Sequence, residues 1–284
     1  MWVSWCDQLK VDIIQAPVTV LIDFLLTIFD QGKSYNTVNT YRSAISATIK
    51  SISGRDLGSH HLVSRFMKGI FQVNPPRPKY NDTWDVNQVT QYLRGLFPVN
   101  ELTLKNLSLK LVTLLALASA QRGQTLQALN VTNMKIQEDK IIFVVSDRLK
   151  TTRPGHESVN VVFPALRDNC PLCPRLHLLE YIKRTEALRN GCTQLFISYC
   201  KPHKSVTSST LARWIKQVLE TAGIDVQKYT AHSTRSAATS KAFLNGASIS
   251  DILKLGNWSN ENTFSKFYKR CPPSSVSIEQ MILS

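Results

Sequence analysis

The sequence predicts a mainly α-helical protein of two domains that carries one small β-hairpin or sheet. Three observations support this fold class. Apolar residues recur at helical spacing through most of the 284 residues, a proline-rich stretch interrupts them once, and only two runs of β-branched residues occur. The expected division is an N-terminal helical domain at 1–72, a linker at 73–82 and a C-terminal α+β domain at 83–284.

The N-terminal domain is expected to be a small helical bundle. Its helices are predicted at 18–32, 36–52 and 61–71. Asn36 is a suitable N-cap for the second helix, and Gly54 is a suitable stop. The third helix has Leu62, Phe66 and Ile70 on one stripe, so these residues are expected to face the bundle core.

The linker and the C-terminal domain follow from changes in the sequence pattern. The segment QVNPPRPKYND contains three prolines within four residues, which cannot continue a helix and favour an extended spacer. Beyond it, KIIFVVS and SVNVVFP predict a two-stranded hairpin with the basic tip DRLKTTRPGHE. Helices are expected at 86–97, 103–119, 173–188, 208–222, 236–245 and 248–255, with a last one from about 259.

The charge of the chain indicates a polyanionic partner. The net charge is +14, from 34 basic and 20 acidic residues. Residues 1–78 hold +3 of this excess and residues 79–284 hold +11. Lys and Arg gain free energy by releasing counterions from phosphates, so nucleic acid is the expected ligand. No run approaches the roughly 20 apolar residues of a membrane span, and the start lacks the pattern of a signal peptide, which predicts a soluble intracellular protein.

The six cysteines do not predict a metal site. The cluster CPLCPRLH offers Cys170, Cys173 and His177, but Cys192 and Cys200 are spaced too widely to complete a tetrahedral zinc site. Reduced structural thiols are therefore expected. A zinc-dependent RNA-binding module stays as a distant alternative, which a measurement of bound metal would decide.

Two C-terminal segments carry residue types suited to phosphate chemistry. In AHSTRSAATSKAF, His232 precedes Arg235 by three residues at the head of a predicted helix, a position that favours an anion. The guanidinium fork of arginine matches phosphate geometry and stays charged. In LGNWSNENTFSKFYKR, Trp258 is followed ten residues later by Tyr268, whose hydroxyl can form a covalent bond to phosphorus.

These motifs resemble the signature of the tyrosine recombinase, or phage-integrase-like, family. The resemblance extends to SAQRGQTLQALNV and DRLKTTRPG, which supply an arginine and a lysine in the family's order. The implied catalytic set is Arg122, Lys150, His232, Arg235, Trp258 and Tyr268. The N-terminal bundle resembles the family's core-binding domain, so the resemblance covers nearly the whole chain. SYNTVNTYRSAIS, PPRPKY and KTTRPG are most similar to recombinases of eukaryotic DIRS-like retroelements.

The resemblance implies a site-specific DNA recombinase that cleaves and rejoins DNA through a 3′-phosphotyrosine. The arginines would clamp the phosphate, Lys150 would protonate the leaving 5′-oxygen and His232 would assist proton transfer from Tyr268. Trp258 would donate its indole N–H to phosphate or support the nucleophile. The implied partners are double-stranded DNA and further copies of the chain, as a tetramer on paired sites. Mobile-element integration without any cofactor, metal or small-molecule substrate is expected, in the nucleus of a eukaryotic host or otherwise in the cytoplasm.

Three departures from the family pattern stand in the sequence. Thr125 lies three residues after the first arginine, where the family often has a Glu or Asp that supports the catalytic residues. This chain lacks that acidic support. The usual gap of nine residues from His or Trp to Tyr reaches Phe267 here, whereas ten reaches Tyr268. Asn257 lies between Gly and Trp, where many relatives have no residue.

Other interpretations stay open at this point. Taken singly, each candidate residue is also typical of ordinary structure, as a helix cap, a surface charge or part of an aromatic core. A catalytically decayed or domesticated DNA-binding protein would keep the basic charge without needing the tyrosine. A type IB topoisomerase-like enzyme would use similar chemistry without strand exchange, and the small size and compact bundle favour recombination.

Overall fold

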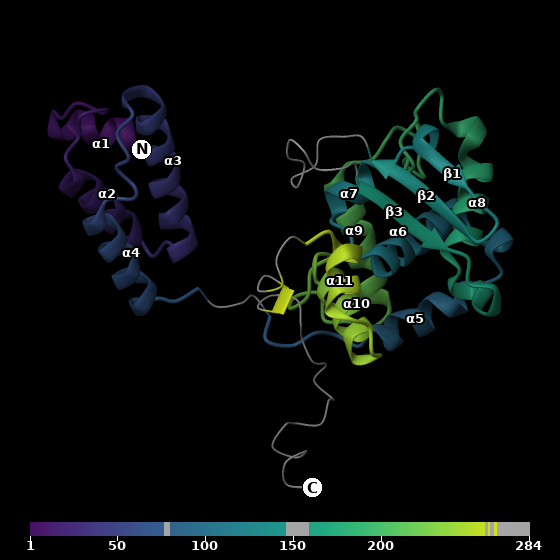
Figure 1. The fold of residues 1–284 in the computed structure, drawn as a ribbon. Helices are drawn as coiled ribbons and strands as arrows, with labels where there is room; N and C mark the ends of the chain where they lie inside the picture. Colours follow the sequence, from purple (N-terminus) through teal and green to yellow (C-terminus); the bar gives the residue numbers. More distant parts are fainter. Residues whose placement is uncertain (77–79, 146–158, 259–260, 262–263, 266–284) are drawn as a thin grey trace, which may run out of the picture. The chain divides into compact units, whose positions relative to one another are not determined.

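The structure, a computed structural model, describes residues 1–76, 80–145, 159–258, 261 and 264–265 (Figure 1). The chain divides into two compact units, Met1–Lys79 and Tyr80–Ser284. Each unit has its own hydrophobic core and is described by itself. The mainly helical fold class with a small sheet is confirmed. No helix among the described residues is long and apolar enough to cross a membrane.

The N-terminal unit is a four-helix bundle. Its helices are α1 (Trp2–Leu9), α2 (Val18–Asp30), α3 (Tyr35–Ser53) and α4 (His61–Val73). The first helix was not expected from the sequence, because its apolar side consists mainly of two tryptophans in a short amphipathic stretch. Trp2 and Trp5 pack edge-to-face on Phe24 of α2, with ring centroids 5.3 and 5.8 Å apart. These aromatic contacts attach α1 to the bundle.

Two sequence predictions about this unit were wrong in detail. The N-cap of α3 is Ser34, whose hydroxyl accepts a hydrogen bond from Thr37 N, rather than Asn36. In α4 the buried residues are Val63, Met67 and Ile70, and Phe66 packs against the same core, so the predicted stripe holds at Ile70 and Phe66 but not at Leu62. Leu62 is 39% exposed instead. A helical period does not decide which edge of the apolar stripe is buried most deeply, and packing against α2 and α3 buries Val63 and Met67 in place of Leu62.

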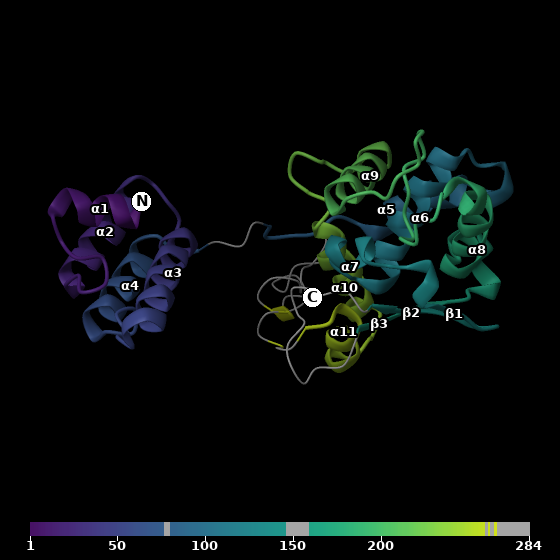
Figure 2. The same ribbon diagram turned by 90° about the horizontal axis from the view of Figure 1, so that it is seen from above.

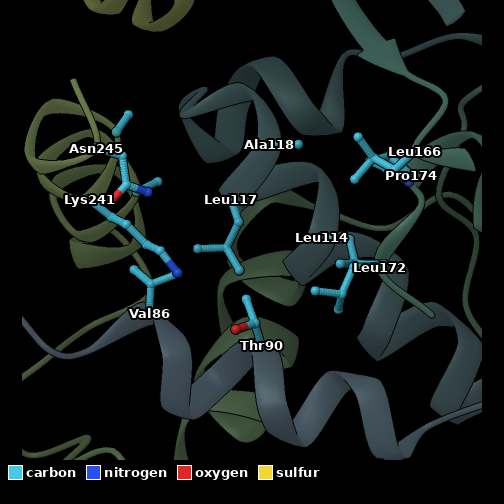
Figure 3. A pocket seen from close by; sticks show the side chains of 12 residues that line it. Val86, Thr90, Leu114, Leu117, Ala118, Leu166, Leu172, Pro174, Lys241 and Asn245 are labelled. Carbon is cyan, nitrogen blue, oxygen red and sulfur yellow. The ribbon is translucent and has the colours of Figure 1, made fainter. Parts of the chain in front are cut away.

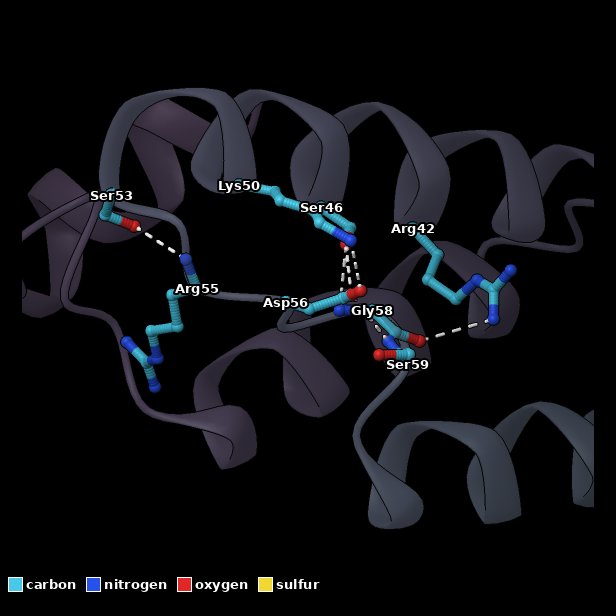
Figure 4. A network of polar contacts seen from close by, with 8 residues as sticks. All are labelled: Arg42, Ser46, Lys50, Ser53, Arg55, Asp56, Gly58 and Ser59. Carbon is cyan, nitrogen blue, oxygen red and sulfur yellow. Dashed lines mark hydrogen bonds and ion pairs between the residues drawn. The ribbon is translucent and has the colours of Figure 1, made fainter.

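The loop between α3 and α4 is tied to α3 by a polar network (Figure 4). Ser46 of α3 accepts a hydrogen bond from Gly58 N at 2.9 Å, and Arg42 donates to Gly58 O at 3.3 Å. Lys50 forms an ion pair with Asp56 at 2.9 Å, and this carboxylate also accepts from Ser59 N. The loop therefore lies so close to α3 that residue 58 has no space for a side chain.

Gly58→Ala is expected to destabilise the N-terminal unit. A Cβ at residue 58 would lie 2.6 Å from both Cβ and Oγ of Ser46, so the loop must shift and its hydrogen bonds must lengthen. The expected loss is about 1–3 kcal/mol in the free energy of unfolding. Urea unfolding of the full chain, followed by hydrogen exchange in α3, measures it. The matched control is Gly69→Ala in α4, where no atom lies within 4 Å and a small gain is expected.

The C-terminal unit is an α+β domain. Its α-helices are α5 (Val86–Gly95), α6 (Leu104–Ser119), α7 (Gly123–Gln127), α8 (Pro174–Thr185), α9 (Ser208–Thr221), α10 (Ser233–Leu244) and α11 (Ile249–Gly256). The strands are β1 (Met134–Ile136), β2 (Lys140–Val145) and β3 (Val159–Pro164), and short 3₁₀ turns are η1 (Val99–Glu101), η2 (Val131–Asn133), η3 (Arg167–Leu172) and η4 (Glu186–Leu188). Of the final helix expected from about 259, the structure describes Glu261, Phe264 and Ser265 as helical.

The sheet is antiparallel, with strand order β1-β2-β3. The hairpin predicted from the two β-branched runs is present, with Val145 paired to Val159 next to the connecting segment. The sequence missed β1, because three residues with little burial give no strand pattern. Side chains of one face, including Ile141 and Phe143, are buried, and Figure 2 shows α6 and α8 on one side of the sheet. Both α6 and α8 contact β3.

Helix α6 is the centre of the C-terminal core, since every residue from 107 to 116 is buried. One of these residues is a lysine. Lys110 is fully buried, donates to Leu96 O at 2.6 Å and has its Nζ 5.8 Å from the centre of the Phe97 ring. Burial lowers the pKa of Lys110 to about 8, because an ammonium ion loses its hydration there.

The buried lysine predicts a pH dependence of stability. The unfolded chain holds the Lys110 proton up to a pKa near 10.4, whereas the native chain releases it from about pH 8. Between these values the unfolded state binds more protons, so the free energy of unfolding rises with pH in that window. We expect the difference between wild type and Lys110→Met to change by on the order of 3 kcal/mol from pH 7.5 to 10.5. Urea unfolding of both proteins across this range measures it, and parallel pH curves would contradict the assignment.

The boundary between the units, at 79/80, lies within the linker expected at 73–82. Helix α4 continues to Val73, and the C-terminal unit begins at Tyr80. Residues 80–82 belong to the C-terminal unit because Tyr80 and Asp82 bond to residues 228–230, nearly 150 positions later in the chain.

Candidate active site

The first turn of α10 holds two of the predicted site residues together. His232 is the N-cap residue of this helix and is exposed. Arg235 lies one turn further on and is only 2% exposed. Its Nη2 donates to Gly256 O at 2.7 Å, and its Cζ lies 4.2 Å from the centre of the Trp258 ring. A cation stacked on indole and bonded to a carbonyl has a fixed orientation at the head of a helix.

Trp258 reaches Arg235 through the geometry of the α11 C-terminus. Asn257 caps α11 in the left-handed conformation with φ 52°, and Trp258 N donates back to Leu253 O at 2.9 Å. Asparagine tolerates this conformation better than most residues, which suits it to the position between glycine and tryptophan. Trp258 is 8% exposed and packs with Ile252 and Phe264 in a small separate core.

Gly256→Ala is expected to displace the tryptophan from the arginine. A Cβ at residue 256 would lie 1.7 Å from Cζ3 of Trp258, so the indole cannot keep its position. We expect a loss of about 1–3 kcal/mol in the stability of the C-terminal unit. Thermal unfolding measures this loss. Gly95→Ala at the end of α5 is the control, since no atom lies within 4 Å of the added Cβ there. Equal effects of the two substitutions would contradict the close packing of Trp258.

Arg122 lies where α6 ends and α7 begins. It is the N-cap residue of α7, with extended backbone at φ −71° and ψ 151°, and it is half-buried. The preceding Gln121 is 6% exposed, and its Nε2 donates to Leu255 O at 2.7 Å. Leu255 and Gly256 are neighbours, so the end of α11 receives one hydrogen bond from beside Arg122 and another from Arg235. Sequence reasoning missed Gln121, because its partner is 134 residues away.

Lys150 and Tyr268 lie outside the described residues. The structure places β2 and β3 on either side of the segment that contains Lys150. Two other tyrosines of this unit are already engaged through their hydroxyls. Tyr181 donates to Ile197 O at 3.3 Å, and Tyr229 donates to Asp82 at 2.8 Å. Burial raises the pKa of both phenols, which makes them poor nucleophiles.

The cysteine and histidine cluster has structural contacts in this fold. Cys173 is the N-cap residue of α8, and its Sγ accepts from Leu176 N at 3.5 Å. The His177 ring Nδ1 lies 2.8 Å from Cys173 O, and burial lowers the pKa of His177 to about 4. Thr125, at the position where the sequence departs from the family pattern, is buried in α7. Within the described part of the chain, no three His, Cys, Asp or Glu side chains form a group that could hold a metal.

A separate apolar pocket of about 300 Å³ lies among α5, α6 and α10 (Figure 3). Leu114, Leu117 and Leu172 contribute to its lining. The charged residue in this lining is Lys241, which bonds to Asn87. The pocket has neither an arginine nor a histidine in its lining, so it does not offer the groups needed for phosphate transfer.

Comparison with known proteins decides the family. The profile described as "Phage integrase family" matches residues 90–272, well over half of the chain, and this range contains all six predicted site residues. The chain belongs to the phage integrase family. The family resemblance seen in the sequence is thereby confirmed, whereas the likeness to DIRS-like recombinases stays a prediction. No curated protein sequence is similar enough to count as a match.

Solved structures of integrases and of a site-specific recombinase share the fold at low sequence identity. The Tn1549 transposon integrase, solved in complex with transposon right end DNA, is 14% identical with a TM-score of 0.59 over 95% of this chain and 84% of its own. The XerH site-specific recombinase bound to its difH substrate is 14% identical, with a TM-score of 0.62 over 88% and 67%. A λ integrase dimer bound to a core site is 16% identical, with a TM-score of 0.58 over 97% and 89%.

Proposed function

We propose that this member of the phage integrase family cleaves and rejoins double-stranded DNA through a covalent 3′-phosphotyrosine at Tyr268. The observation that carries the proposal is the arrangement of Arg235, which is buried, stacked on Trp258 and placed one turn after His232 at the start of α10. This arrangement supplies a fixed cation where charge develops on the oxygens of a phosphate under attack.

The remaining roles follow from the chemistry of the reaction. Arg122 at the start of α7 is the second cation for the non-bridging oxygens. Lys150 protonates the departing 5′-oxygen, and His232 assists proton transfer from the Tyr268 hydroxyl. Trp258 orients Arg235 and shields it from water. The phosphotyrosine bond keeps the energy of the phosphodiester, so a DNA hydroxyl can later attack it and rejoin the strands.

The partners and the biological setting are part of the same proposal. The λ integrase has been solved as a tetramer bound to a Holliday junction, which supports assembly of four copies of this chain on paired DNA sites. The N-terminal bundle is the core-binding domain of the proposed enzyme, and the net charge of +14 supports contact with DNA. The similarity of three sequence segments to DIRS-like elements supports a role in mobile-element integration, in the nucleus of a eukaryotic host.

The direct test is detection of a covalent protein–DNA adduct. The protein is incubated without metal with supercoiled plasmid and a panel of duplex oligonucleotides, and the products are denatured in SDS. We expect DNA attached to the chain, and a nucleotide-bearing peptide that contains Tyr268 after proteolysis. Attachment at any other residue would contradict the assignment. Tight, salt-sensitive DNA binding without an adduct on any substrate would favour the decayed DNA-binding protein.

A further inference from the structure

The C-terminal unit begins with a short segment that lies along the turn before α10. This segment, residues 80–84, is named the 80–84 strap here. The Tyr80 hydroxyl accepts a hydrogen bond from Thr230 N at 3.2 Å and lies 2.9 Å from Thr230 Oγ1. The rings of Tyr80 and Tyr229 are 5.5 Å apart. The strap thus contacts both the backbone and the side chains just before His232.

Asp82 fixes the strap to the same turn with a second set of bonds. Its carboxylate forms an ion pair with Lys228 at 2.6 Å and accepts from the Tyr229 hydroxyl at 2.8 Å. The hydrogen bond from Lys228 is the main cause of a pKa of Asp82 below its usual range. The carboxylate is therefore ionised at neutral pH, and both bonds to the turn are charge-assisted.

Trp84 reaches the residue next to His232. Its indole Nε1 donates to Ser233 Oγ at 2.8 Å, and the same hydroxyl donates to Thr230 O at 2.7 Å. Trp84 is 3% exposed and Ser233 is 2% exposed, so water does not compete for these bonds. The hydroxyl of Ser233 closes the turn on which His232 sits, and the indole of Trp84 fixes the direction of that hydroxyl.

We propose that Trp84 and Asp82 are positioning residues of the strand-cleaving reaction. Through Ser233 and the 228–230 segment they hold His232 and the first turn of α10, including Arg235, in the geometry that the phosphate requires. Both residues act through the 228–233 segment, to which the structure shows them bonded. A displacement of about 1 Å in such a group lowers a reaction rate by as much as about 100-fold. The inference rests on the function proposed above. It is tested by two measurements, one of structure, which does not depend on activity, and one of the reaction rate.

The structural readout is hydrogen exchange in residues 230–235 of the full chain. Trp84→Phe keeps an aromatic ring but removes the indole N–H donor together with the volume of the second ring. We expect exchange in this segment to accelerate by at least about tenfold more than in a control variant that loses the same side-chain volume elsewhere in the core. The matched control is Trp214→Phe in α9, which is equally buried but packs on Phe196 and Tyr199. Unchanged exchange in Trp84→Phe, or equal acceleration in both variants, would overturn the proposal whatever the activity of the protein.

The catalytic readout is the single-turnover rate of adduct formation at saturating DNA. For Trp84→Phe we expect a rate about 10- to 100-fold lower with an unchanged Kd for DNA. The double variant Trp84→Phe/Ser233→Ala is expected to be no slower than the slower single variant, because both changes break the same hydrogen bond. The adduct rate of Asp82→Asn is compared with that of Glu138→Gln, which breaks an exposed ion pair to Arg167 in another part of the unit. We expect the rate to fall in Asp82→Asn and to stay at the wild-type value in Glu138→Gln. A lower DNA affinity at an unchanged rate would overturn the positioning role, and wild type without adduct would count against the proposed function alone.

Discussion

Replacing Tyr268 with phenylalanine is expected to abolish the covalent protein–DNA adduct at every incubation time. The substitution removes one oxygen atom, which is the nucleophile at the phosphorus in the proposed reaction. DNA affinity is expected to stay within about twofold of wild type, because phosphate contacts by Lys and Arg dominate binding. Adduct formation after SDS denaturation and fluorescence anisotropy with labelled duplex measure the two quantities on one preparation.

The matched control for this prediction is Tyr199→Phe. Tyr199 is a half-buried tyrosine stacked on Trp214, with ring centroids 5.1 Å apart, and it lies in the same unit. Its loss is expected to leave adduct formation unchanged. The double variant Phe267→Tyr/Tyr268→Phe moves the hydroxyl to the nine-residue spacing from Trp258 that is usual in the family. We expect the double variant to be inactive. A fully active double variant would show that the reaction does not require the nucleophile ten residues after Trp258.

Replacing Arg235 with lysine is expected to slow adduct formation by on the order of 10²–10³-fold. Lysine keeps the charge but loses the planar fork, the stacking on Trp258 and the bond from Nη2 to Gly256 O. The cation is then no longer fixed beside the position of the phosphate. Single-turnover rates at saturating DNA measure the effect, at a temperature where thermal unfolding shows both proteins to be folded.

Arg213→Lys provides the comparison for the arginine prediction. Arg213 is an exposed residue of α9 with a long hydrogen bond of 3.4 Å to Thr210. Its variant makes the same arginine-to-lysine exchange as Arg235→Lys. We expect its adduct rate to equal that of wild type. A rate for Arg235→Lys within about threefold of wild type would contradict the role of Arg235 as a phosphate clamp.

Local patterns in the sequence were sufficient for most of the fold. The helical stripes of α2, α3 and α9, the glycine stop at Gly54 and the strand pair β2–β3 all arise from neighbouring residues. Elements with little local pattern were missed, such as α1 and the short strand β1. In α4 the prediction was wrong at Leu62, because packing against other helices buries Val63 and Met67 instead.

The candidate site divides in the same way. His232, Arg235 and Trp258 were predicted from short motifs, since each has a fixed spacing from a helix end. The residues that hold them were not predicted. Trp84 bonds to Ser233 across 149 residues of sequence, and Gln121 bonds to Leu255 across 134. Such pairs exist only after the chain has folded, and a single sequence carries no local sign of them.

The 80–84 strap limits how the two units can be exchanged between proteins. A chimaera that brings a new DNA-reading domain to this catalytic unit must join it before Tyr80, rather than at residue 83, the domain start expected from the sequence. A junction at 83 would discard Tyr80 and the Asp82 carboxylate that bind the turn of His232. The strap must therefore stay with the C-terminal unit in any chimaera, and the connection between the units can be redesigned only up to residue 79.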